Sequence, residues 1–573
     1  MQRNLFTFLL TLSLLVSTSL LKAQGQDERD GYLQTYGQVW GFLKYFNPSA
    51  LPDPVAWDQQ LRKDYSTIQT LSSPADFETF LEQFIRPYIP KDIRYTRPSA
   101  LPGMTLPSFG WINEDRISPG IRKELLLILK HGKAKPHPSF SVSDGLVPVF
   151  DAEKSDPIDS LPNEAGRYLA LTRFWNVINY FAPNLDLCDR WDEAYPHFIP
   201  AFRHVNSYRS YCMQVQKLAS RMNDGHGYVN LLPGNKNQVA PPYRLPLGLE
   251  YIEGQTYIVS VIDTVKGKLS VLHPGDRILS INDRPMEALW DSLLPVISGS
   301  NALYKRELGC KLKLIKSWYA NNTLVVLRGT DTIRTQVTAS LPVSHPSWAQ
   351  TDPIKTSWRI IHDSVSGNDI GYVNMGALKR KEVKIAFHAF RKAPFVMIDC
   401  RDYPNSTIYK VMNQLTLRGG AFMKFNRIRF DDPGTMDWQL SSKPRGLMMK
   451  LIVRLIIGKP DKKNRHYYKG KVILLVDHFT MSQGEFSVMA FQLAPQVITI
   501  GRQTAGADGN AVPVPLPGGL TVSYSSLGVF YPDGTRTQQQ GIRLDIRVPE
   551  TRVSLIGKDY IYLRALEYMR TGR

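Results

Sequence analysis

Apolar residues recur at helical spacing in two stretches of the chain that resemble each other in sequence. The first, YGQVWGFLKYFNP, spans residues 36–48, and the second, LTRFWNVINYFAP, spans residues 171–183. Each copy ends at a proline and is followed by a Trp-Asp pair, so the apolar period and the stop signal both repeat. The pattern predicts two related helical units, at residues 28–92 and 164–224, with a Pro- and Gly-rich linker between them.

From about residue 241 the apolar period changes from that of helices to that of strands. The runs TYIVSVID, DRILSIND and TLVVLRG are short, β-branched and separated by turn residues, which predicts a small β-rich domain. After about residue 350 the runs IGYVNM, FVMID, VILLVD and VITIG are typical of buried strands, and helical stretches separate them. This alternation predicts an α/β domain, closed by a helix at IYLRALEYMR.

Residues 1–24 have the layout of a secretory signal peptide. Arg3 precedes an apolar run from Leu5 to Leu21, and small or polar residues follow that run. The run is short and interrupted by Thr and Ser, which favours cleavage over a membrane anchor. We therefore expect an exported protein that is periplasmic or secreted.

Length and charge add little to this picture except at one place. A chain of 573 residues with 43% hydrophobic and 21% charged residues predicts several folded domains. Part of the net charge of +19 gathers between Lys443 and Lys471, where ten basic residues and the single acid Asp461 surround GLMMKLIVRLIIGK. If this segment is helical, its apolar residues lie all around the helix instead of forming one stripe. We therefore favour packing on the protein over contact with a membrane surface. No nucleic-acid-binding motif is present, so nucleic acid is not an expected partner.

The cysteines and histidines do not predict a metal site. There is no HExxH sequence and no close cysteine pair, so neither a metal nor another cofactor is expected. One disulfide is compatible with an exported chain, but the spacing does not say which of the four cysteines would form it: Cys188, Cys212, Cys310 and Cys400.

A candidate nucleophile stands in VILLVDHFTMSQGEFSVMAFQ. An apolar strand ends at Asp477, and a helix is expected to begin near Ser482. A serine there lies at the carboxyl edge of the sheet, where open α/β proteins place their sites, and N–H groups of the first helical turn can stabilise an oxyanion. Ser482 and Glu485 also have the spacing of a capping box. The residues alone therefore leave a helix cap and a nucleophile both open.

GKVILLVDHFTMSQGEF resembles the nucleophile segment of the tricorn-core and C-terminal-processing serine peptidases. Other pieces resemble the family's motifs in the same order: RMNDGHGYVN, MIDCRDYPNS, ITIGRQTAGADGN, PLPGGL and GIRLDIRVPET. The match covers most of residues 164–555. PLGL and HPGDRILSINDRP, which follow the histidine motif, resemble a PDZ domain, a module that captures extended peptides by strand addition.

The resemblance implies a multidomain protein of bacterial origin. Together with the residue patterns above, it divides the chain into a signal peptide (1–24), an N-terminal helical unit with linker (25–155), a second helical unit carrying the histidine motif (156–240), a PDZ-like domain (241–345) and an α/β, ClpP/crotonase-like peptidase core (346–573).

The resemblance also implies roles for individual residues. Ser482 is the expected nucleophile and His226 the general base of the tricorn-like Ser-His branch. The other branch has a lysine where this chain has Ala507, which excludes a Ser-Lys pair by this alignment. Gln538 occupies the place of the glutamate that orients the histidine. Its amide can accept from an imidazole N–H, but it cannot stabilise imidazolium as a carboxylate does.

Backbone groups complete the expected site. The N–H of Gln483 is one expected oxyanion donor, and the loop at Asn405 and Ser406, where the family usually has two glycines, supplies the other. The PDZ resemblance assigns peptide binding to three loop residues, Leu247, Gly248 and Leu249.

The resemblance predicts a serine endopeptidase acting on proteins or peptides, with a PDZ domain that presents or gates substrate C-termini. The alternative is a catalytically weak or inactive protein that binds a peptide or apolar ligand on the same scaffold, because fold does not settle function. Gln538 and the absent glycines favour this alternative, while the presence of Ser482 and His226 favours the peptidase. A third, weaker hypothesis is a surface interaction module that uses the basic 443–471 segment.

Overall fold

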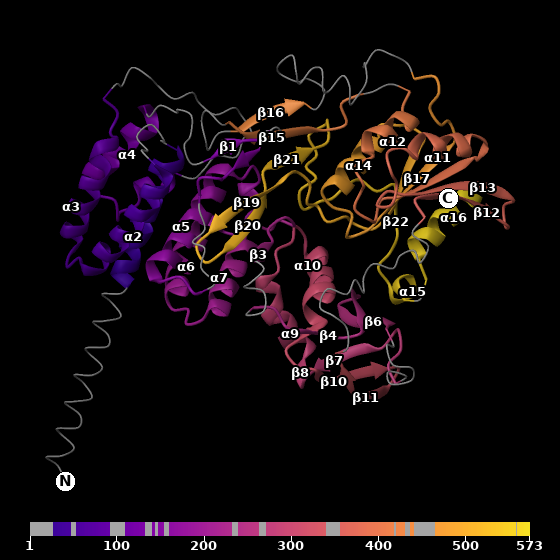
Figure 1. The fold of residues 1–573 in the computed structure, drawn as a ribbon, viewed down its shortest axis with the longest axis horizontal. Coiled ribbons are helices and arrows are strands. Elements are labelled where there is room, and N and C mark those ends of the chain that lie inside the picture. The colour runs from indigo at the N-terminus through magenta and orange to yellow at the C-terminus, as the bar shows by residue number, and fades with distance from the viewer. Residues whose placement is uncertain are drawn as a thin grey trace, which may run out of the picture.

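A computed structural model of the chain shows a helical region, a β-rich domain and an α/β core in succession (Figure 1). It describes residues 27–46, 53–91, 109–131, 140–143, 147–153, 160–231, 239–262, 271–339, 356–417, 420–429, 436–440, 464–556 and 558–573. The expected signal peptide and residues 443–463 of the basic segment lie outside the described residues. Within those ranges, no helix has both the length and the apolar character needed to span a membrane.

The N-terminal region is helical and packs around one continuous apolar cluster. Residues 27–41 are helical, and the elements after them are η1 (Phe42–Phe46), α2 (Pro54–Thr70), α3 (Pro74–Ile85), α4 (Pro119–His131), the short strands β1 (Ser141–Val142) and β2 (Pro148–Val149), α5 (Glu164–Phe181), α6 (Trp191–Arg203) and α7 (Tyr208–Ser220). Helices α2, α3, α5 and α7 begin where a side-chain oxygen accepts from a first-turn N–H, at Asp53, Ser73, Asn163 and Ser207.

The two similar sequence stretches make the same contact in the fold. The indole N–H of Trp40 donates to the carbonyl of Trp57 at 3.4 Å, and that of Trp175 donates to the carbonyl of Trp191 at 2.9 Å. All four tryptophans belong to the same cluster, and α2 packs against α5. The two helical units expected from the sequence therefore share one core.

The β-rich domain is a sheet in the order β11-β10-β7-β6-β5, with β8 paired to β7. Its elements are β5 (Leu247–Ile252), β6 (Gln255–Val261), β7 (Arg277–Ile281), β8 (Arg284–Pro285), α9 (Met286–Leu293), α10 (Ala302–Gly309), η8 (Cys310–Leu314), β10 (Asn321–Arg328) and β11 (Asp331–Thr338). A separate pair, β4 (Tyr243–Arg244) and β9 (Lys316–Ser317), stands beside it. Strand β5 is an edge of the sheet, and α10 and η8 pack against it.

The α/β core is a sheet in the order β12-β13-β14-β17-β18-β22, parallel except for β12. Its strands are β12 (Trp358–Asp363), β13 (Asn368–Asn374), β14 (Phe395–Asp399), β17 (Lys471–Val476), β18 (Val497–Gly501) and β22 (Ile546–Arg547). Helices α11 (Val383–Ala389), α12 (Ile408–Leu415) and α14 (Gln483–Phe491) cover one face, and α16 (Tyr560–Thr571), after the short α15 (Arg552–Leu555), covers the other. Alternate residues of β17 point to the two faces, as a strand period of two requires: Val472, Leu474 and Val476 to one, Ile473 and Leu475 to the other.

Two small sheets tie the core to the helices. One has the order β19-β20-β3, from β19 (Ala511–Leu516), β20 (Leu520–Ser525) and β3 (Val229–Leu231), and the other has the order β16-β15-β21, from β15 (Lys424–Ile428), β16 (Met436–Leu440) and β21 (Leu527–Phe530). Apolar residues of β19 and β20 belong to the cluster of the N-terminal helices. Because β3 begins just after His226, this sheet carries the histidine motif onto the core (Figure 1).

Candidate active site

Ser482 stands between the loop after β17 and the first residue of α14. Its φ of 52° lies in the left-handed region, which a residue with a side chain occupies only at a cost. The Ser482 N–H donates to the carbonyl of Ala507 at 2.9 Å, and its side chain caps no N–H of the helix. The hydroxyl is therefore left for chemistry, and the helix-cap interpretation of this serine is wrong.

Glu485, the other member of the expected capping box, bonds elsewhere. Its buried carboxylate accepts from the N–H groups of Gly506 and Ala507, at 2.8 and 2.9 Å, and from the hydroxyl of Thr504. Burial raises the pKa of Glu485 to about 7, against the effect of these hydrogen bonds. The carboxylate thereby holds the 504–507 turn on α14, and with it the Ala507 carbonyl that receives the Ser482 N–H.

His226 lies in the turn between α7 and β3, and its side chain is buried. The turn packs against the same segment as Ser482, because a Cβ added to Gly225 would lie 2.6 Å from the Cβ of Ala507. Ala507 thus contacts both the nucleophile and the histidine turn, which are 256 positions apart in the sequence (482 − 226). In the described part of the chain, neither Ser482 Oγ nor His226 Nε2 forms a hydrogen bond.

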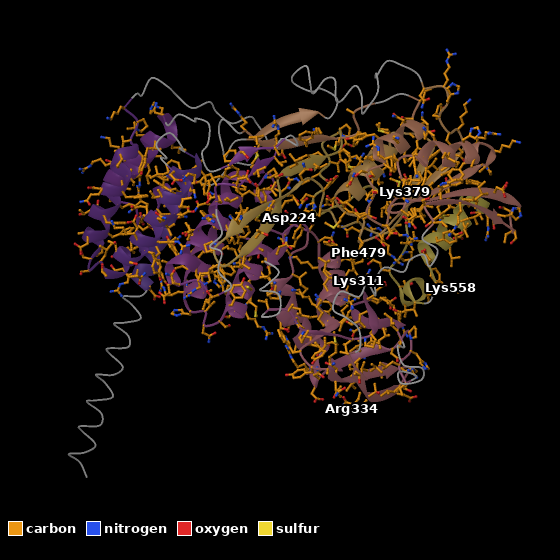
Figure 2. The ribbon with its side chains drawn as sticks, in the orientation of Figure 1. Asp224, Lys311, Arg334, Lys379, Phe479 and Lys558 are labelled. Carbon is orange, nitrogen blue, oxygen red and sulfur yellow. The ribbon has the colours of Figure 1, made fainter. Side chains whose placement is uncertain are left out.

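The Nδ1 atom of His226 is 2.8 Å from the hydroxyl of Ser525, the last residue of β20. That hydroxyl lies 2.8 Å from Oδ1 of Asp224, and the Ser525 N–H donates to Oδ2 at 2.6 Å. Figure 2 shows Asp224 where the helical region meets these strands. Sequence reasoning assigned no role to Asp224 or Ser525. Asp224 stands inside the quoted NDGHG motif and could have been found there, whereas nothing in the sequence around Ser525 points to the histidine.

Gln538 is buried next to this group, but it does not orient the imidazole directly. Its Nε2 donates to Oδ1 of Asp224 at 3.3 Å, while the histidine's Nδ1 is taken by Ser525. The expectation that the Gln538 amide accepts from the imidazole is therefore not what the structure shows.

The electrostatics of His226 suit a general base. Burial lowers its pKa, and the nearby Asp224 carboxylate opposes that shift. Because burial prevails, the imidazole is neutral at neutral pH and able to accept a proton.

Of the expected oxyanion donors, Gln483 directly follows Ser482, and the loop that carries the other approaches the first turn of α14. Gln483 is the first residue of α14, and Pro404 lies close to Gly484, whose added Cβ would be 3.9 Å from the proline Cδ. The Asn405 N–H donates to the carbonyl of Met375 at 3.0 Å, so it is engaged in the loop. Ser406 is exposed and has a φ of 51°, a conformation in which glycine would be unstrained. Of the two loop residues predicted, Ser406 is the one whose N–H remains for an oxyanion.

The predicted peptide-binding residues Leu247, Gly248 and Leu249 begin β5, and both leucines are buried. The outward side of β5 is covered, since the Tyr251 N–H donates to Oε1 of the buried Glu307, on α10, at 3.1 Å. The chain just before β5 is covered too, because the N–H of Leu245 donates to the carbonyl of Ile315, which follows η8.

The α10–η8 segment also contacts the loop that leads to Ser482. The Tyr304 hydroxyl lies 3.2 Å from the sulfur of Met481, and Nζ of Lys311 lies 3.5 Å from the centre of the Phe479 ring. Figure 2 shows Lys311 and Phe479 together where the β-rich domain meets the core. One short segment therefore contacts both the edge strand of the β-rich domain and the nucleophile loop.

The described residues contain no group of three or more His, Cys, Asp or Glu side chains placed to hold a metal ion. The four cysteines are free thiols, three of them buried, so the disulfide considered from the sequence is not formed in this structure.

Known proteins were compared with the chain by sequence and by structure. The profile of peptidase family S41 matches residues 369–548. Mature CPAF complexed with lactacystin superposes with a TM-score of 0.54 at 13% sequence identity, over 71% of this chain and 98% of that one. The photosystem II D1 C-terminal processing protease gives 0.37 at 13% identity, over 69% and 98% of the two chains, and the tricorn protease gives 0.37 at 13%, over 71% and 37%. No curated protein is similar enough in sequence to count as a match.

Proposed function

We propose, from the premise that residues 369–548 form a peptidase family S41 domain, that this chain hydrolyses peptide bonds through an acyl-enzyme on Ser482. The observation that carries the proposal is the pairing of an uncapped, strained Ser482 with a buried neutral His226 across Ala507. Catalytic hydrogen bonds in unliganded enzymes are often long and tighten when substrate binds, so the open Ser482–His226 pair is compatible with this role.

The reaction follows from these positions. His226 Nε2 accepts the hydroxyl proton as Ser482 Oγ attacks the peptide carbonyl carbon. The N–H groups of Gln483 and Ser406 stabilise the oxyanion, and its collapse expels the amine, which takes the proton from His226. Water then attacks the ester with the same histidine as base, releasing the acid and restoring Ser482.

A fluorophosphonate probe tests this mechanism directly. Mature protein is labelled alongside the Ser482→Ala and His226→Ala variants, with folding checked by circular dichroism. We expect labelling of the wild type, none of Ser482→Ala, and a rate for His226→Ala lower by about 10²–10⁴-fold, the usual contribution of a general base. A folded wild type that does not label, with or without added peptide, would favour the binding-protein alternative.

The β-rich domain supports a gating role in this proposal. A peptide added to β5 as a further strand would need to accept from the outward N–H of Tyr251, which already donates to Glu307. A peptide that added to β5 would displace α10, and α10 contacts the nucleophile loop through Tyr304. We therefore favour gating of the site by substrate C-termini over simple presentation.

Peptide titrations of matched variants test the gate. Glu307→Ala frees the Tyr251 N–H, so we expect tighter binding of a fluorescent peptide with a free C-terminus, measured by anisotropy. Arg334→Ala is the control, because Arg334 is an exposed residue of β11, at the opposite edge of the sheet (Figure 2). Equal affinities for both variants, or binding of a C-terminally amidated peptide with the same affinity, would contradict the gate.

Export is part of the same proposal, on the evidence of the first 24 residues. N-terminal sequencing of the protein purified from the periplasm or medium of an expressing bacterium tests it. We expect a mature chain that begins near residue 25, and recovery of the uncleaved chain from the cytoplasm would contradict export.

A further inference from the structure

The hydrogen bonds around His226 determine which ring nitrogen carries the proton. Ser525 has one hydroxyl proton and lies 2.8 Å from both His226 Nδ1 and Asp224 Oδ1. A carboxylate can only accept, so the Ser525 proton points to Asp224. The Ser525 oxygen then accepts from His226, which places the imidazole proton on Nδ1 and leaves the lone pair of Nε2 free.

Asp224 is held by donors on every side. Besides the Ser525 hydroxyl it accepts from the N–H groups of His226 and Ser525, at 2.9 and 2.6 Å, and from Nε2 of Gln538. Because all four groups donate to Asp224, they hold its carboxylate in place, and Oδ1 remains the acceptor of the Ser525 hydroxyl. The hydroxyl direction, and with it the histidine tautomer, is fixed by the fold.

We propose that Ser525 and Asp224 form a positioning pair that holds His226 in the base-competent tautomer and places a carboxylate charge behind the imidazolium formed during catalysis. This inference rests on the proposed function and deepens it. The pair supplies what Gln538 cannot, because Ser525 orients the ring and Asp224 provides the negative charge. Gln538 acts one step further away, as a donor that fixes Asp224.

The charge of Asp224 has a measurable consequence for the histidine. Burial lowers the pKa of His226 and Asp224 raises it. Asp224→Asn removes the raising effect, so the pKa must fall further. Since only neutral His226 is a base, the rate rises with pH through this pKa, and its midpoint must move to lower pH in the variant.

The chain offers a matched control for Ser525. Ser526, the next residue, is equally buried, and its hydroxyl donates to the Asn510 carbonyl at 3.0 Å. Ser526→Ala therefore removes one buried hydroxyl and one hydrogen bond at the same strand end without touching His226. Ser525→Thr is the conservative variant, because it keeps a hydroxyl at the position that contacts the imidazole.

The first measurement is the second-order rate of fluorophosphonate labelling between pH 5 and 9. We expect Ser525→Ala to lose about 10²-fold, near the lower end of a general base's contribution, Ser525→Thr to retain most of the rate, and Ser526→Ala to match the wild type. Asp224→Asn should lose rate and shift the midpoint of the pH profile to lower pH. If Ser525→Ala labels as Ser526→Ala does, with the same midpoint, the positioning pair is refuted while the peptidase stands.

The second measurement does not depend on activity. The imidazole ¹⁵N resonances of His226, assigned by their loss in His226→Gln, report the tautomer in histidine-labelled protein. We expect the Nδ1–H form in the wild type and in Ser526→Ala, and a mixture of tautomers in Ser525→Ala. A wild type that does not label but shows this pattern would refute the proposed function and retain the pair. The Nε2–H form in the wild type would refute the pair whatever the labelling.

Discussion

The contact between Gly225 and Ala507 should set the distance between the nucleophile Ser482 and the base His226. A Cβ at Gly225 would lie 2.6 Å from the Cβ of Ala507, whereas carbon atoms pack at about 3.5–4.0 Å, so Gly225→Ala must move the two turns apart by roughly 1 Å. Its other near contacts, with Ser300 and Tyr304, are at 3.1 Å and require shifts of only a few tenths of an ångström. The Ala507 contact is therefore the one that sets the displacement.

That displacement predicts two magnitudes. Forcing one methyl group into a packed site costs about 1–3 kcal/mol of folding stability. A misplacement of about 1 Å between reacting groups can lower the rate about 10²-fold. We expect Gly225→Ala to lower the urea midpoint modestly and the fluorophosphonate labelling rate by about 10²-fold.

A double-mutant cycle identifies the cause. Ala507→Gly removes the opposing methyl group, so the double variant Gly225→Ala/Ala507→Gly should recover most of the labelling rate. The measurements are labelling rates and urea unfolding of the wild type, both single variants and the double variant. Additive losses in the cycle, or a Gly225→Ala variant that labels at the wild-type rate, would refute the argument that Ala507 sets the spacing.

Three further changes have outcomes fixed by the structure. Lys44→Met leaves Asp58 and Glu153 buried with one cation fewer, and urea unfolding should show a loss of about 3–5 kcal/mol. Burial raises the pKa of Glu307 to about 8 from 4.5, so the folded chain binds a proton that the unfolded chain has released, and stability falls as pH rises between these values. Glu307→Gln should flatten that slope, compared by unfolding at pH 5 and pH 8. Ser406→Gly should relieve left-handed strain of about 1 kcal/mol, seen as a raised urea midpoint, and a lowered midpoint would argue against strain there.

The parts of the fold that local sequence patterns specify were predicted well. The apolar run that ends before Asp477 is strand β17, and the helix expected near Ser482 is α14. These assignments succeeded because a buried strand and the helix after it are encoded by consecutive residues. The family resemblance drew on the same segments, and the match of residues 369–548 to peptidase family S41 confirms it. The PDZ assignment and the expected signal peptide stay predictions.

The parts that depend on distant contacts were missed. Glu485 has the spacing of a capping residue, but in the folded chain its carboxylate accepts from the N–H groups of Gly506 and Ala507 instead. Ser525 lies 299 residues from the histidine that it contacts, and a serine in a strand carries no pattern that marks such a partner. The repeated helical stretches predicted two units, but only packing could show that they bury their tryptophans in one core.

Gln538 illustrates why a single departure from a family motif is weak evidence about activity. Judged by position, it replaces the acid that orients the histidine, and this departure favoured the weak or inactive alternative over the expected peptidase. The chemistry requires a group that accepts from the Nδ1–H of the histidine and a negative charge behind that group. Either group can come from any part of the chain that the fold brings to the histidine. Here Ser525 supplies the acceptor and Asp224 the charge, and the amide of Gln538 is suited to its place because it donates to that carboxylate, which a glutamate could not do. A glutamate at 538 would put a second carboxylate against Asp224, so Gln538→Glu should lower the labelling rate at neutral pH. If it raised the rate instead, position 538 would be the orienting site and Asp224 would not.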